Sequence, residues 1–308
     1  MQIDTLPVDR DSLGESPVWD ERIQALYWSD QFGKRVRRFE PATRAYHEWA
    51  VPKILGSVAL TEDVNVLLIV LSDGFYRLDL SSGLCSCMRE MPQPRPGVRL
   101  NEGRCDPSGR LIAGSVVTDG GDAVGTIYRL SGDGHTEVIR EGMVIPNAVC
   151  FSRDGDKLYY TCSRAGVITV RDYDRSGNFI GVEREFADIR PHGRAPDGAT
   201  VDADNCFWVA LIMSGLILRF RPDGTLDRKI ECPAPHPSSV AFGGPGLDTL
   251  FVTTVRETGM LIKSDHLQSG STLAITGLGV RGVAERRFCF KNQTKAHTHG
   301  SPQRNANQ

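Results

Sequence analysis

Residues that can bind metal ions stand at the start of a short phrase that recurs along the chain. Two copies begin with a carboxylate and two with an amide, and carboxylate and amide oxygens suit Ca²⁺, Mg²⁺ or Mn²⁺, while Zn²⁺ and Fe²⁺ also accept them. The six copies begin at Glu15, Ser57, Asn101, Asn147, Asp197 and Ser238, about 40 to 50 residues apart. A single Asn or Asp could instead end a strand by bonding the backbone, but four polar residues in register favour a shared cation site.

Short apolar strands and tight turns follow each of these phrases. The second strands include 25–28, 66–70 and 206–210, and glycine opens third strands such as 125–130 and 215–220. A repeat of this length and composition is typical of one four-stranded blade of a β-propeller. The sequence therefore predicts an all-β, six-bladed propeller, with the polar residues gathered at one mouth of its central channel.

The ends of the chain suggest how the circle closes. Closure usually requires both ends to share a blade, so that no sheet edge is left open. We expect residues 277–282 and the first ten residues to form this clasp. The propeller domain is predicted to span residues 1–290, and the polar residues 291–308 are predicted to form a disordered tail.

Composition narrows the class of protein. The 308 residues include 36 Lys and Arg against 38 Asp and Glu, a formal charge of −2. This balance argues against nucleic-acid or membrane-surface partners and favours a small molecule. The sequence shows no export signal or membrane span, and the eight cysteines lack paired metal-ligand spacing, so we expect a cytoplasmic protein with reduced thiols, either monomer or homodimer.

Several phrases resemble one known family in order and spacing. The resemblance is to the regucalcin/gluconolactonase family, also called senescence marker proteins, which are six-bladed propellers with one catalytic metal. It covers residues 13 to about 288. The matching phrases are Leu13-Gly-Glu-Ser-Pro-Val-Trp19, Arg99-Leu-Asn-Glu-Gly103, Pro146-Asn147, Pro196-Asp-Gly-Ala-Thr-Val-Asp202 and Gly279-Val-Arg-Gly282.

The resemblance implies a role for each matching position. It implies that Glu15, Asn147 and Asp197 bind one divalent metal (Ca, Zn, Mn, Mg or Fe), and that Asp197 is also the catalytic base. Three further residues, Arg99, Asn101 and Asp119, would bind the substrate. The activity implied is hydrolysis of an aldono-1,4- or 1,5-lactone to the aldonic acid. A bound cation would polarise the carbonyl and, with Asp197, activate water.

Some positions depart from the family pattern, and alternatives stay open. Glu102 stands where the family usually has Asp, Ala148 where it usually has Gly, and Cys162 where it commonly has Asp. Arg99 could instead be a surface residue paired with Glu102. A phosphotriesterase or arylesterase on the same scaffold would favour a more apolar mouth. A non-catalytic calcium-binding propeller would leave the cation no open position for substrate.

Overall fold

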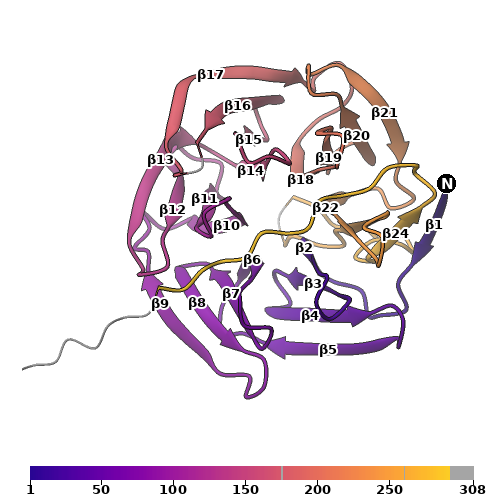
Figure 1. Ribbon diagram of the computed structural model, residues 1–308, viewed down its shortest axis with the longest axis horizontal. Coiled ribbons are helices and arrows are strands. Elements are labelled where there is room, and N and C mark those ends of the chain that lie inside the picture. The colour runs from indigo at the N-terminus through magenta and orange to yellow at the C-terminus, as the bar shows by residue number, and fades with distance from the viewer. Residues whose placement is uncertain (175, 260, 292–308) are drawn as a thin grey trace, which may run out of the picture.

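The chain forms a six-bladed propeller in which every blade is a four-stranded antiparallel sheet (Figure 1). The computed structural model describes residues 1–174, 176–259 and 261–291. Within these ranges the regular structure consists of 24 strands and no helix. The predicted fold class is confirmed.

Blades 1 to 6 are numbered from the N-terminus, and each contributes one strand to each of four concentric positions. The innermost strands are β2 (Gly14–Asp20), β6 (Leu55–Leu60), β10 (Val98–Cys105), β14 (Pro146–Phe151), β18 (Pro196–Val201) and β22 (Pro237–Gly243). The second strands are β3 (Ala25–Asp30), β7 (Val66–Leu71), β11 (Leu111–Val117), β15 (Lys157–Cys162), β19 (Phe207–Leu211) and β23 (Thr249–Thr254).

The two outer positions complete each blade. The third strands are β4 (Arg35–Glu40), β8 (Gly74–Asp79), β12 (Gly125–Leu130), β16 (Val167–Tyr173), β20 (Leu216–Phe220) and β24 (Leu273–Thr276). The outermost strands are β5 (Ala45–Ala50), β9 (Cys85–Glu90), β13 (Thr136–Met143), β17 (Phe179–Asp188), β21 (Leu226–Glu231) and β1 (Gln2–Thr5).

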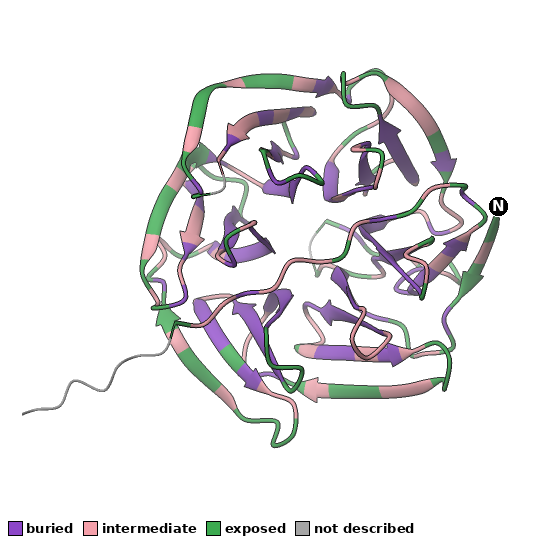
Figure 2. Cartoon of the chain, in the orientation of Figure 1, coloured by how far each residue is buried: buried purple, intermediate pink, exposed green. Residues whose placement is uncertain are grey.

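Burial decreases from the axis outward (Figure 2). Every residue of the inner strands β2, β6 and β7 is buried, whereas the outermost β5 is half-buried or exposed. Strands covered on both faces favour continuous apolar runs, which explains sequences such as Val66-Leu-Leu-Ile-Val-Leu71. Side chains of neighbouring blades share one core: Val18 and Tyr27 of blade 1 pack with Ile69 of blade 2. This packing holds the innermost strands around the channel.

The N-terminal strand closes the circle. Strand β1 pairs with β24 in blade 6, in a register that places Ile3 opposite Ile275. The expectation for the first residues is confirmed, but residues 277–282 do not supply the partner. Gly277 and Gly279 have φ of 70° and 72°, which ends the strand at Thr276. The predicted tail at 291–308 lies outside the described residues apart from Lys291.

A β-bulge interrupts each innermost strand at its polar phrase. In blade 1 the register shifts between Glu15 and Val18, and in blade 4 between Asn147 and Cys150. The other four innermost strands also shift close to the start of their phrase. A bulge bends the strand and turns a side chain away from the regular alternation. It therefore allows the polar residue of each phrase to leave the sheet plane at the channel mouth.

None of the described segments is a helix that could cross a membrane. All eight cysteines are free. Cys105, Cys150 and Cys206 are buried, as expected for small apolar side chains in these strands.

Candidate active site at the channel mouth

Three of the predicted residues form a hydrogen-bonded row across blades 3, 4 and 5. The Nδ2 group of Asn101 donates to Oδ1 of Asn147 at 3.1 Å, and Nδ2 of Asn147 donates to Oδ1 of Asp197 at 2.6 Å. These residues are separated by 46 and 50 positions along the chain. All three are buried. The propeller thus brings distant polar side chains together, as the repeat predicted.

Glu15 contributes a second buried carboxylate from blade 1. Its Oε2 accepts the backbone N–H of Ser16 at 3.1 Å. Burial raises the pKa of Glu15 well above its usual range, and the carboxylates of Asp197 and Glu102 raise it further. The pKa of Asp197 is raised in the same way, first by burial and then by Glu102. The mouth therefore gathers carboxyl groups whose ionised forms are unfavourable there in the absence of a cation.

Glu102 lies beneath this row as a third buried carboxylate. Its Oε2 accepts the backbone N–H of Val149 at 3.4 Å, while its Oε1 has no hydrogen-bond partner. Burial raises the pKa of Glu102 to about 7, against the opposing effect of Arg104. A buried oxygen without a donor is costly. A cation bound at this mouth would therefore also stabilise the ionised form of Glu102.

Arg99 and Gln31 fix the other end of the row. Nη1 of Arg99 donates to Oδ1 of Asn101 at 2.8 Å, and Nη2 donates to Oε1 of Gln31 at 3.0 Å. Burial lowers the pKa of Arg99 to about 10, opposed by the nearby carboxylate of Glu15. The guanidinium also lies 5.8 Å from the ring centre of Phe32. The hydrogen bonds of the Arg99 side chain go to Asn101, Gln31 and the backbone oxygen of Leu100 rather than to Glu102.

Gln31 and Ser163 are site residues that the sequence did not single out. Gln31 Nε2 donates to Oδ1 of Asn101 at 3.2 Å, and Ser163 Oγ accepts Nδ2 of Asn147 at 3.1 Å. Each comes directly after the second strand of its blade, β3 or β15. Because the second strand runs antiparallel to the first, its end lies beside the polar phrase. That position in the repeat was the signal that could have identified them.

Asp119 lies apart from the hydrogen-bonded row. It follows β11 near the same edge, but it is exposed and pairs with Arg95. This ion pair, helped by the backbone N–H of Gly121, lowers the pKa of Asp119 to about 2. The structure therefore brings Arg99 and Asn101 to the mouth and keeps Asp119 in an ion pair outside the row.

The donor set fits one divalent cation of the oxygen-preferring kind. Glu15 and Asp197 supply two carboxylates under mutual repulsion, which a cation would relieve. In the described ranges, no three His, Cys, Asp or Glu side chains are grouped for metal binding, so the set depends on the amide of Asn147. That amide turns its nitrogen toward Asp197, and a half-turn would present its oxygen instead.

Two backbone features position these ligands. Ala148 follows Asn147 with φ of 58°, a conformation that glycine adopts more easily and that costs alanine about 1 kcal/mol. Gly198 follows Asp197, and a Cβ there would lie 2.0 Å from Oγ of Ser239 in blade 6. The close approach of β18 to β22 therefore requires glycine beside Asp197.

The fold and the site define a class of protein: six-bladed propellers with a buried row of acids and amides at one mouth of the channel. Similarity to known proteins identifies the family within this class. The SMP-30/Gluconolactonase/LRE-like region matches residues 13–256. Because this match spans most of the sequence, the chain belongs to that family.

Similar proteins share most of their length with this chain. It is 33% identical over 279 residues to a 6-deoxy-6-sulfogluconolactonase of Pseudomonas putida, covering 90% of this chain and 94% of that protein. It is 36% identical over 251 residues to an L-arabinolactonase of Azospirillum brasilense, covering 80% and 82%. A solved structure of a calcium-binding protein, regucalcin, from Agrobacterium tumefaciens aligns with a TM-score of 0.85 and 27% identity, covering 92% and 96%.

Proposed function

We propose that this chain hydrolyses a sugar lactone to the corresponding aldonic acid, using one divalent cation held by Glu15, Asn147 and Asp197. The observation that carries the proposal is the 2.6 Å contact between Asn147 and Asp197. This contact places the amide of Asn147 against the carboxylate of Asp197, which interacts electrostatically with the second buried acid, Glu15. The names of the relatives support a lactone as substrate, since two of them are called lactonases.

Asp197 is proposed to accept the proton of the attacking water. Burial and the charge of Glu102 raise the pKa of Asp197 in the metal-free protein. A carboxylate within hydrogen-bond reach of a bound water can accept its proton as a general base. A bound divalent cation would supply a Lewis acid for the ester carbonyl. Ser163 holds the strand of Asp197 in place, because its Oγ donates to the backbone oxygen of Pro196 at 2.6 Å.

Arg99 and Asn101 are proposed to bind the hydroxyl groups of the sugar. Arg99 presents several donors in a fixed plane, and Asn101 offers both a donor and an acceptor. Asp119 is proposed as a further ligand at the rim, where substrate would have to compete with Arg95 for its carboxylate. This polar mouth favours a sugar lactone over the more apolar substrates of a phosphotriesterase or arylesterase.

A second candidate is a propeller that binds calcium without catalysis. The solved relative described as calcium-binding favours it. The two candidates differ in whether lactone is cleaved once the cation is bound.

The test is proton release from a panel of aldono-1,4- and 1,5-lactones by protein stripped with chelator and then reloaded with Ca²⁺, Mn²⁺, Mg²⁺ or Zn²⁺. We expect hydrolysis of at least one lactone that depends on the added metal. Glu15→Ala and Asp197→Ala should lose it, whereas the exposed Asp248→Ala should keep it. Full activity in either site variant would contradict the mechanism, and calcium binding without hydrolysis of any lactone would favour the second candidate.

A further inference from the structure

The C-terminal segment crosses the end of the channel opposite the site. Residues 277–291, here called the strap, run from blade 6 across the centre of the propeller toward β9 (Figure 1). Gly282 N–H donates to Leu247 O at 2.7 Å, Phe288 N–H to Leu60 O at 2.7 Å, and Cys289 N–H to Gly109 O at 2.9 Å. Leu60 ends an innermost strand and Gly109 follows one, whereas the site residues stand near the starts of such strands. The strap therefore covers the far mouth.

Arg104 lies inside the channel between the strap and the site. It belongs to β10 and is buried. Its Nη1 donates to Pro17 O of blade 1 at 3.4 Å, and its Nη2 donates to Ala199 O of blade 5 at 3.0 Å. Pro17 and Ala199 each stand two residues after a carboxylate of the site, Glu15 and Asp197. One guanidinium thus joins the two strands that carry the acidic ligands.

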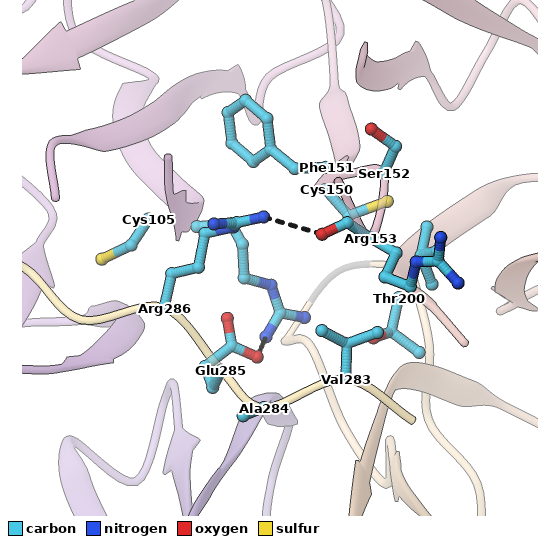
Figure 3. Close-up of a pocket in the computed structure, with 12 residues that line it drawn as sticks. Cys105, Cys150, Phe151, Ser152, Arg153, Thr200, Val283, Ala284, Glu285 and Arg286 are labelled. Carbon is cyan, nitrogen blue, oxygen red and sulfur yellow. Dashed lines mark hydrogen bonds and ion pairs between the residues drawn. The ribbon is translucent and has the colours of Figure 1, made fainter. Parts of the chain in front are cut away.

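The strap holds this guanidinium with a carboxylate. Glu285 Oε2 lies 2.9 Å from Nη1 of Arg104, in a pocket that both residues line (Figure 3). Glu285 and Arg286 extend from the strap in this view, and Arg286 donates instead to the backbone oxygen of Arg153 at 3.0 Å. Glu285 is thus the strap side chain that pairs with Arg104.

We propose that Glu285 is a positioning residue for the cation site and acts through Arg104. This inference rests on the cation site of the proposed function. With Glu285 present, the Arg104 guanidinium is held by its ion pair with Glu285 and bridges β2 and β18. The charge of Glu102 attracts the same guanidinium. Without Glu285, a buried guanidinium would keep Glu102 as its main counter-charge and shift toward it. Its positive charge and the loosened bridge would both weaken cation binding at Glu15 and Asp197.

The decisive variant is Glu285→Gln, with Glu21→Gln as its matched control. Glu21 pairs with Arg287, so the control removes an ion pair of the same strap with the same change of charge, but far from Arg104. The readout is the calcium dissociation constant of chelator-stripped protein, measured by isothermal titration calorimetry. We expect Glu285→Gln to weaken calcium binding about tenfold, as loss of groups supporting metal ligands commonly does. Glu21→Gln should stay within twofold of the wild type.

A double-mutant cycle with Arg104→Lys shows whether the effect passes through the guanidinium. In that background the bridge is already lost, so Glu285→Gln should change the constant by less than twofold. Circular dichroism melting confirms that each variant is folded. Unchanged calcium binding in Glu285→Gln, or equal weakening in Glu21→Gln, would overturn the proposal.

Lactone hydrolysis is measured separately on the same proteins. If Glu285→Gln weakens calcium binding as predicted while the wild type cleaves no lactone, that result would support this inference and contradict the proposed function. A wild type that binds no calcium would overturn the inference itself. Where hydrolysis is present, Glu285→Gln should raise the metal concentration for half-maximal activity and leave kcat at saturating metal within about twofold.

Discussion

The amide nitrogen of Gln31 lies 3.2 Å from Oδ1 of Asn101 and joins blades 1 and 3 across the channel mouth. The same oxygen accepts a hydrogen bond from Arg99. Because two donors bind the side-chain oxygen of Asn101, its amide nitrogen points the other way, toward Asn147. Gln31 therefore orients a row that ends at Asp197, although 70 positions separate it from Asn101.

Replacing Gln31 with alanine should reduce kcat/KM by about tenfold. Asn101 would keep one of its two donors, and the loss of one buried hydrogen bond costs about 1 kcal/mol. Arg99 would also lose its acceptor on Gln31. Steady-state kinetics on the best lactone of the panel provide the measurement. The matched control is Gln93→Ala, whose amide donates to the backbone oxygen of Met91; equal losses in both variants would contradict the orienting role.

Asp197→Asn should separate stability from activity. It removes one of the buried carboxylates that repel each other. The free energy of unfolding of the metal-free protein should therefore rise by about 1 kcal/mol, and its melting temperature by about 2 °C. Activity should fall by about a thousandfold because the proposed base is gone. Thermal melting in chelator and kinetics in calcium measure the two effects. A variant that is inactive and less stable would point to a structural defect instead.

The metal-free protein should lose stability as pH rises from about 5 to 8. The pKa of Glu102 is raised from its usual 4.5 to about 7, so the folded carboxyl keeps a proton that the unfolded chain has lost. This stabilisation is full below the unfolded pKa and disappears as pH passes 7, a change of up to about 3 kcal/mol. Melting curves in chelator across this range measure it.

Two comparisons sharpen the pH prediction. Glu102→Gln should show a flatter pH dependence, and calcium should restore the wild-type midpoint at pH 8 because a cation favours the ionised carboxylates. A wild-type midpoint that does not fall between pH 5 and 8 in chelator would show that these carboxyls are already ionised in the fold.

Removing residues 1–5 should open blade 6 and lower the melting temperature by more than about 5 °C. Strand β1 covers the edge of β24, and Ile3 packs against the core of blades 5 and 6. Ending the chain after Lys291 is the control, since the sequence predicts that the propeller does not need residues 292–308. A larger loss from the C-terminal truncation than from the N-terminal one would contradict the predicted domain boundary.

The repeat predicted the blades, and it predicted which polar residues meet at the channel mouth, because both depend on position within a period. Glu15, Asn101, Asn147 and Asp197 occupy equivalent places, so a propeller must bring them to one mouth. Gln31 was missed because its role depends on a hydrogen bond to Asn101 in another blade, which its place after the second strand suggests but does not specify. The phrase that contains Glu15 predicted a polar residue at the mouth but not the β-bulge in the backbone that follows it.

The two ends of the chain show another limit. The alternation in β1 and β24 is only four residues long, too short to identify the pairing from sequence. The glycine-rich residues 277–282 suggested a clasp, yet they begin a strap that hydrogen-bonds to the far mouth. The Arg104–Glu285 pair joins positions 181 apart that no repeat relates. Contacts of this kind follow from the path of the strap, which the sequence pattern does not encode.

The most direct test of the cation site is anomalous diffraction from a crystal soaked in Mn²⁺. We predict one strong peak at the channel mouth, within bonding distance of oxygens of Glu15, Asn147 and Asp197, with Oδ1 of Asn147 turned toward the metal. A peak elsewhere in the molecule with none at this mouth would contradict the account.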